Sequence, residues 1–495
     1  MPDNIVLITS DQQRYDSLGV HGNETCTTPT LDALAASGLD FQRAHVQNVL
    51  CTPSRSTILT GQEPGTHGVW TNGVQLPIDA PSVASVLSDA GYRTAQLGKL
   101  HYEPQSTFDS WLAETGALPD WRGPYRGFEH VEHVDHFRLI GQYVPWLRER
   151  LPEDQFQAVL AETFQVWSSR GGDTDAPQSV YSALPAAVHN TAWIVERTLA
   201  WLDTLDPGQP FFCWVSFDDP HHPFNPPADY GRRHDWHDVP LPAGLPADAD
   251  ATAAVLAGKP AQYDAYWRGD MGEHEGSGGG WCPRDLTTEQ WRELSALTYG
   301  MIELIDEQIG RLQQGLADRG LADNTHLVFT SDHGELMGEC GLILKGPFHL
   351  QGLLRVSLLW QAPGRAPGVI ADPVGLVDLA PTFCTIAGLD PPEFMDGTPL
   401  PVVDGTRERV LTAFDSAFRD DLKLRSLYRD GWLVTIYPEM DGVGELYDLH
   451  HDPYQFVNLW NDPTYRGWRD DLVTDLRDHV VEDARSERLI RWTYA

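Results

Sequence analysis

Lysine is scarce in this 495-residue chain, although charged side chains are common. The four lysines are Lys99, Lys259, Lys345 and Lys423, and every other basic residue of the 35 is arginine. Seventy-one acidic residues oppose these 35 and give a formal net charge of −36. A chain this acidic repels the phosphates of nucleic acids and anionic membrane surfaces. We therefore expect neither nucleic acid nor a membrane among its partners.

Long apolar segments are also missing. No run approaches the roughly 20 residues that a transmembrane helix needs. Residues 1–4 (Met-Pro-Asp-Asn) lead straight into the apolar segment 5–8, without a basic stretch or a small-residue cleavage site. Secretory leaders carry both features. The sequence therefore predicts a cytoplasmic protein, and it leaves a homo-oligomer open.

Six cysteines are present, and no two of them form a C-x-x-C pair. Such pairs mark zinc ribbons and thioredoxin-like redox sites, so neither class is indicated. Widely spaced cysteines in a long chain without a leader are typical of free, buried thiols. Cys51 does not fit that pattern, because of the residues around it.

Four apolar segments share one property: each ends abruptly at charged or imidazole side chains. They span residues 4–10, 92–98, 211–217 and 326–331. Short runs rich in Val, Ile and Phe are typical of strands buried on both faces of a parallel sheet. The polar residues that follow them are Asp11 with Gln12, Lys99 to His101, Asp218 to His222, and Asp332 with His333.

Amphipathic segments between these strands predict helices over about 30–37, 82–91, 188–205 and 287–315. Alternating strands and helices indicate an α/β fold, with a doubly wound, mostly parallel sheet flanked by helices. In such folds the ligand crevice lies beyond the carboxyl ends of the strands. We therefore expect the polar clusters to meet in one site.

The prediction divides the chain into two units. Residues 1–400 form the catalytic α/β domain, with insertions at about 103–187 and 224–285 that lack a steady period. Long irregular segments in compact folds are usually functional loops, so we expect both insertions at the surface. Residues 401–495 form a smaller α+β domain of short antiparallel strands and a final helix at about 462–481.

Residues 51–61 read Cys-Thr-Pro-Ser-Arg-Ser-Thr-Ile-Leu-Thr-Gly. Pro53 suits the first turn of a helix, where its missing N–H costs nothing. Cys51 would then lie at the helix N-terminus, where the dipole favours a thiolate or a bound anion. Arg55, one turn further on, can face the same point. For an isolated Cys-x-Pro, a buried structural thiol would be the preferred interpretation.

The segment from Cys51 to Gly61 resembles the signature of the type I sulfatases in the alkaline phosphatase superfamily. Further segments resemble the other motifs of that family and follow in family order: Asp11-Gln12, Gly98 to His101, Pro220 to Pro223, Thr330 to Gly334, Lys345 to Phe348 and Glu445 to Leu449. The resemblance covers nearly the whole chain. It implies an alkaline-phosphatase-like fold and a sulfuric ester hydrolase.

The resemblance also implies the cofactors. A separate formylglycine-generating enzyme would convert Cys51 to formylglycine. One divalent cation, Ca²⁺ with Mn²⁺ or Mg²⁺ as alternatives, would be held by Asp11, Gln12, Cys51 after its conversion, Asp332 and His333. Carboxylate, amide and imidazole donors suit these cations better than a thiolate-type zinc site.

The same resemblance assigns the catalytic roles. A hydroxyl of the hydrated aldehyde attacks sulfur, and Arg55 holds that oxygen. Lys99 and Lys345 bind the sulfate oxygens, where charge develops. His221 is the acid for the leaving alcohol, and His101 removes the proton that releases sulfate.

Two departures from the family pattern bear on the substrate. Asp-Gln at residues 11–12 is similar to the phosphonate monoester hydrolases and choline-sulfatases, whereas many relatives carry Asp-Asp there. Leu350 and Gln351 replace the usual Tyr-Glu near Lys345, and the neighbouring His349 is a candidate for the substrate pocket.

The leading hypothesis is hydrolysis of a small sulfate monoester, and the seventeen tryptophans favour a sulfated carbohydrate. The alternatives are a phosphonate monoester or phosphodiester hydrolase with the same site, and a non-catalytic metal-binding protein on the same fold. His130, His133 and His136 resemble a second metal site, but loop histidines without a ligand are the more common case.

Overall fold

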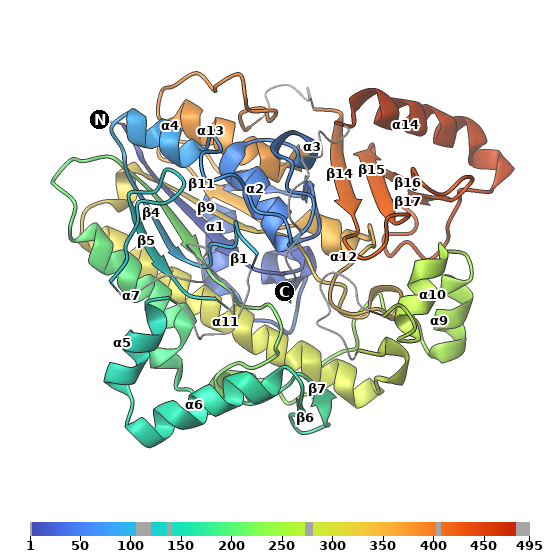
Figure 1. Ribbon diagram of the computed structural model, residues 1–495, viewed down its shortest axis with the longest axis horizontal. Coiled ribbons are helices and arrows are strands. Elements are labelled where there is room, and N and C mark those ends of the chain that lie inside the picture. Colours follow the sequence, from blue (N-terminus) through green and yellow to red (C-terminus); the bar gives the residue numbers. More distant parts are fainter. Residues whose placement is uncertain (1, 105–119, 136–140, 273–280, 402–406, 482–495) are drawn as a thin grey trace.

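The computed structural model describes residues 2–104, 120–135, 141–272, 281–401 and 407–481 (Figure 1). Its centre is an eight-stranded sheet of β1 (Asn4–Ser10), β2 (Leu39–Phe41), β4 (Arg93–Gly98), β5 (His130–His133), β8 (Phe211–Ser216), β9 (Thr325–Ser331), β11 (Leu358–Gln361) and β12 (Gly368–Ile370). The spatial order is β12-β2-β11-β9-β1-β8-β4-β5. In this sheet β11 alone runs opposite to the other strands.

The central strand β1 shows why helices must cover both faces of the sheet. Successive side chains of a strand point to opposite faces. Ile5 and Leu7 pack into one apolar cluster, whereas Val6 and Ile8 pack into another. The first cluster includes α2 (Cys51–Thr60), α4 (Val83–Asp89) and α13 (Leu379–Ile386); the second includes α1 (Pro29–Ser37), α7 (Asn190–Leu202) and α11 (Thr288–Asp318). The predicted doubly wound, mostly parallel α/β fold is confirmed.

The parallel strands end at one edge of the sheet, and their register fixes what meets there. Ser10 at the end of β1 pairs with Ser331 at the end of β9. Gly98 at the end of β4 pairs with Ser216 at the end of β8. The polar segments that follow these four strands therefore start side by side.

The two insertions contain more regular structure than the sequence indicated. The first holds α5 (Tyr143–Arg150) and α6 (Glu153–Val166), and the second holds α8 (Ala228–Gly231), α9 (Ala249–Leu256) and α10 (Ala261–Trp267). The expected surface position was wrong for α10, because Tyr263, Tyr266 and Trp267 are buried. Helices of two turns are too short to show a clear hydrophobic period. Gly276 to Gly280 lie outside the described residues.

The C-terminal segment forms a four-stranded antiparallel sheet of β14 (Arg409–Asp415), β15 (Lys423–Arg429), β16 (Trp432–Ile436) and β17 (Gly444–Asp448), covered by α14 (Arg466–His479) (Figure 1). The predicted short antiparallel strands are confirmed, and α14 begins slightly later than expected. Leu427 and Val434 pack with α14, whereas Leu424 and Leu433 join the apolar cluster of the large sheet. The small sheet is thus buried on both faces. The domain boundary at residue 400 stays a prediction.

Gly98 provides a test of how closely β4 and β8 approach at the site. Its φ is +104°, and a Cβ there would lie 1.9 Å from the backbone oxygen of Ser216. Gly98→Ala is therefore expected to lower the free energy of unfolding by at least about 2 kcal/mol. Gly91 is the matched control, because its φ is +90° but a Cβ there meets nothing within 4 Å. Urea midpoints should fall further for Gly98→Ala than for Gly91→Ala; equal midpoints would contradict the close approach.

Candidate active site

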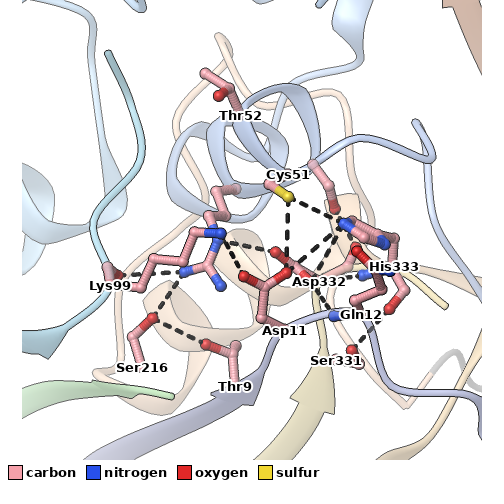
Figure 2. Close-up of polar contacts among 12 residues, drawn as sticks. Thr9, Asp11, Gln12, Cys51, Thr52, Lys99, Ser216, Ser331, Asp332 and His333 are labelled. Carbon is pink, nitrogen blue, oxygen red and sulfur yellow. Dashed lines mark hydrogen bonds and ion pairs between the residues drawn. The ribbon is translucent and has the colours of Figure 1, made fainter. Parts of the chain in front are cut away.

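The residues that follow β1, β4 and β9 converge on the first residue of α2. Figure 2 shows the side chains of Asp11, Cys51, Asp332 and His333 turned toward one another, with Lys99 beside them. All five residues are fully buried. The predicted convergence at the carboxyl edge of the sheet is therefore what the structure shows.

Cys51 begins α2, as its position before Pro53 indicated. Its Sγ lies 3.1 Å from Nε2 of His333, 3.1 Å from Nζ of Lys345 and 3.6 Å from Oδ1 of Asp11. Burial and the Asp11 carboxylate raise the pKa of the thiol, but the charges of Lys345, Lys99 and His333 outweigh them. The net pKa lies below the ordinary cysteine value. The charges around residue 51 therefore favour a side chain there that is negatively charged or rich in oxygen.

Arg55 lies one turn further along α2 and is fully buried. Its Nε donates to Oδ2 of Asp332 at 2.9 Å, and one terminal nitrogen donates to Oγ of Ser216 at 2.7 Å and to the backbone oxygen of Lys99 at 3.2 Å. A planar guanidinium can hold several acceptors in a fixed geometry. Arg55 therefore links the ends of three strands and fixes the orientation of Asp332.

Lys99 pairs with the other carboxylate of the site. Its Nζ forms an ion pair with Oδ2 of Asp11, and both side chains are removed from solvent. Burial alone would raise the pKa of Asp11, but Lys99, Arg55 and Lys345 hold it well below its usual value. Asp11 is therefore ionised at neutral pH, ready to bind a cation.

Among the charged groups that act on Cys51 the positive ones outnumber the carboxylates, because the nearby carboxylate of Glu335 contacts Gln12 instead. Arg55, Lys99 and Lys345 face Asp11 and Asp332, and all five are fully buried. Buried charges without partners are costly, so an excess of one sign favours a ligand of the other sign. The site thus suits an anionic ligand, although the whole chain is strongly acidic.

Gln12 follows Asp11 with a positive φ of 63°. Its backbone N–H donates to Oδ1 of Asp332 at 3.1 Å, and its side-chain oxygen accepts from Lys345 at 2.8 Å. The amide nitrogen donates to the carboxylate of Glu335. Glu335 was not among the predicted site residues, although an acidic residue directly after the Asp-His-Gly segment was a signal.

The donor set fits a divalent cation. Asp11, Cys51, Asp332 and His333 each offer one ligand atom, and these atoms lie within 4.8 Å of one another. Two carboxylates and an imidazole suit Ca²⁺, Mn²⁺ or Mg²⁺ once the thiol is replaced by an oxygen donor. Four of the five predicted ligands are thus together, and Gln12 borders them through its bond to Asp332.

The three histidines predicted for the site have different surroundings in the structure. Nε2 of His221 lies 2.9 Å from Nζ of Lys345, which places His221 at the site. His101 is buried two residues after Lys99, with a positive φ of 59°. His349 is buried against β15, where its Nδ1 lies 2.5 Å from Oγ of Ser426.

The run of three histidines does not form a second metal site in the described part of the chain. His130 and His133 both lie on β5, where residues three apart point to opposite faces. His130 contacts Glu132 at 3.1 Å, and Nδ1 of His133 lies 3.2 Å from the backbone oxygen of Gly98. His136 lies outside the described residues.

Fold and site together are those of a hydrolytic enzyme of the alkaline phosphatase superfamily, and comparison with known proteins agrees. The family model described as Sulfatase matches residues 3–389. An arylsulfatase of Clostridium perfringens is 30% identical over 94% of this chain and 92% of that protein. A choline-sulfatase of Rhizobium meliloti is 26% identical over 93% and 83%. This chain belongs to the sulfatase family, as its motifs predicted.

Solved structures show the same relationship. A phosphonate monoester hydrolase of Agrobacterium radiobacter superimposes with a TM-score of 0.79 at 26% identity, covering 96% of this chain and 95% of that one. The predicted likeness to that side of the superfamily is confirmed. Within the described ranges, every helix is too short or too polar to span a bilayer.

Asp332 provides a test of the metal site. We expect Asp332→Asn to weaken binding of Ca²⁺ or Mn²⁺ at least about tenfold, because the neutral amide removes one charged ligand. A bound cation stabilises the native state, so thermal unfolding of chelator-treated protein titrated with each metal measures the affinity. Asp415→Asn is the matched control, since Asp415 is a buried carboxylate paired with Arg425 in the small sheet. An unchanged metal-dependent shift in Asp332→Asn would contradict the assignment.

Proposed function

We propose that this chain hydrolyses a sulfate monoester to an alcohol and inorganic sulfate. The observation that supports it is the buried cluster of Arg55, Lys99 and Lys345 around Cys51 at the start of α2. The excess of positive charge next to Cys51 favours an anion at this point. Membership of the sulfatase family supports the same reaction.

Two groups complete the proposed site. A divalent cation at Asp11, Asp332 and His333 would polarise a sulfate oxygen. Formylglycine at residue 51 would supply a pair of hydroxyls on one carbon, which an ordinary cysteine or serine lacks. We propose Ca²⁺ as the cation, with Mn²⁺ or Mg²⁺ as alternatives, and a formylglycine-generating enzyme as partner.

The chain's own cations bind and orient the ester. Nζ of Lys345 lies 3.1 Å from Sγ of Cys51, so an ester that approaches residue 51 meets this ammonium group directly. Lys99 reaches the site from the end of β4, where its Nζ pairs with Asp11. Both ammonium groups stabilise the negative charge that develops on the sulfate oxygens. Arg55 holds Asp332 in place and adds its charge to the same field.

His221 donates the proton to the oxygen of the leaving alcohol. Its Nδ1 donates to the backbone oxygen of His222 at 2.5 Å, so the imidazolium form carries the transferred proton on Nε2, which lies 2.9 Å from Nζ of Lys345. His101 takes the proton from residue 51 that accompanies release of sulfate. One imidazole thus serves each half of the reaction: His221 serves the release of the alcohol, and His101 serves the release of sulfate.

Cys51→Ala is expected to lower the rate of aryl sulfate hydrolysis by at least about 1,000-fold, because it removes the nucleophile. The circular dichroism spectrum and Tm should stay close to those of the starting protein. Cys384→Ala removes another buried thiol, on α13, and should retain activity. Turnover by Cys51→Ala at the starting rate would refute the proposed nucleophile.

A second candidate is hydrolysis of phosphonate monoesters, which the structural likeness to a phosphonate monoester hydrolase favours. A sulfate monoester presents three terminal oxygens, whereas a phosphonate monoester presents two and a carbon substituent. Lys99, Lys345 and the cation would give one positive group to each sulfate oxygen. We therefore expect kcat/KM for an aryl sulfate to exceed that for the matching aryl phosphonate by at least about tenfold. The reverse order would favour the second candidate.

The finer parts of the proposal concern substrate and location. We propose a small sulfated compound, with a sulfated carbohydrate as the first choice, and a cytoplasmic location. His349 remains the proposed substrate-facing residue near Lys345. Its Nε2 has no hydrogen-bond partner among the described residues, which leaves it able to bind a polar group.

A further inference from the structure

Lys345 lies in a segment that has no helix or strand to hold it. Residues 342–350 are irregular, and Leu344 and Gly346 have positive φ values of 61° and 151°. Lys345 nevertheless contacts Cys51, Gln12 and His221 at 2.8–3.1 Å. Something outside the segment must therefore keep this ammonium group in place.

Three backbone oxygens on the two sides of Lys345 accept hydrogen bonds from distant side chains. The hydroxyl of Tyr266 donates to Ile343 at 2.6 Å, and Nε2 of Gln262 donates to Pro347 at 3.5 Å. Nε2 of Gln455 donates to His349 at 3.1 Å. The donors come from α10 and from the segment after β17, so two separate parts of the chain hold the Lys345 segment.

Ring contacts add to these hydrogen bonds. Phe348 is fully buried, and its centroid lies 4.8 Å from that of Tyr263 and 5.3 Å from that of Tyr266. Aromatic pairs at such distances contribute beyond the apolar area that they bury. Phe348 is thus fixed between two rings of α10, three residues from Lys345.

Two of these donors, Gln262 and Gln455, are linked through other side chains to one buried carboxylate, Glu445 on β17. The hydroxyls of Tyr437 and Tyr447 donate to Glu445 at 2.5 Å, and that of Tyr263 donates at 3.3 Å. Burial raises the pKa of all three tyrosines well above the usual value, so they stay protonated donors. Gln262 also donates to Tyr437 at 2.8 Å. Glu445 is itself fully buried.

Lys259 closes the network from the other side. Its Nζ donates to the hydroxyl of Tyr447 at 2.8 Å and to the backbone oxygen of Gln455 at 2.7 Å. It lies 5.0 Å and 4.6 Å from the ring centroids of Tyr263 and Tyr447. In Figure 1, α10 lies beside the sheet that carries β17. Lys259 and Glu445 therefore join α10 to the small sheet around the Lys345 segment.

We propose that Glu445 is a positioning residue for Lys345. It orients the tyrosines that hold Gln262 and α10, and α10 in turn fixes the segment that carries the catalytic ammonium group. This inference rests on the proposed function, because it assumes that Lys345 binds the reacting sulfate. A misplacement of about 1 Å at a reacting group can cost about 100-fold in rate.

The test is a double-mutant cycle of Glu445→Gln and Lys345→Ala, measured with an aryl sulfate. Glu445→Gln alone should lower kcat about 10- to 100-fold and change KM less than about threefold. In the Lys345→Ala background it should have almost no further effect, because the group that it positions is gone. Equal losses in both backgrounds would overturn the inference.

Glu293→Gln is the matched control. Glu293 is also a fully buried carboxylate that accepts from a tyrosine, Tyr181, at 2.9 Å, but it lies on α11. Its variant should retain kcat per folded molecule. If Glu445→Gln fails to fold, Tyr437→Phe removes one bond to the same carboxylate and enters the same cycle. An additive result for Tyr437→Phe would also overturn the inference.

Hydrogen exchange separates this inference from the proposed function. Amides of residues 342–350 should exchange at least about tenfold faster in Glu445→Gln than in the starting protein, while β1 and β9 stay protected. This comparison needs no enzymatic activity. Inactivity of the starting protein toward every sulfate ester would refute the proposed function alone. Unchanged exchange in residues 342–350 would refute the positioning role alone.

Discussion

Two buried ion pairs, Lys99 with Asp11 and Arg55 with Asp332, are the interactions on which the rest of the site depends. Each joins a residue at the carboxyl end of a strand to a charge from another element. Removing one partner would leave an uncompensated charge in a dry interior, which costs several kcal/mol. The register of the parallel strands therefore has to be kept for the charges to remain paired. Sheet and site thus stabilise one another.

The buried cations of the site explain how an acidic chain can offer a cationic pocket. The net charge of −36 is distributed over 495 residues, whereas the excess of positive groups is local. Exposed charges are screened within about 8–10 Å at ordinary salt, but buried ones are screened much less. A small anion inside the pocket therefore responds mainly to Arg55, Lys99 and Lys345. Three of the four lysines therefore have a proposed role. Lys99 and Lys345 bind the anion, and Lys259 belongs to the network that holds Lys345.

The sequence could predict those parts of the fold and the site that depend on which residues follow one another along the chain. Asp11, Lys99 and Asp332 directly follow apolar strands, so their meeting at one edge followed from the parallel sheet. Glu335 directly follows the Asp-His-Gly segment, but Glu445 could not be placed in that way. Glu445 meets Tyr263 across 182 residues of sequence, and helix α10 gave no clear period. The position of Glu445 beside α10 depends on tertiary contacts that no local pattern encodes.

The central claim is that residue 51 acts as formylglycine inside this cationic pocket. The most direct measurement is mass spectrometry of the peptide that contains residue 51, from protein produced together with a formylglycine-generating enzyme and active on an aryl sulfate. The account predicts the aldehyde in place of the thiol, in proportion to specific activity across preparations. Full activity in protein that carries only unmodified cysteine at residue 51 would contradict it.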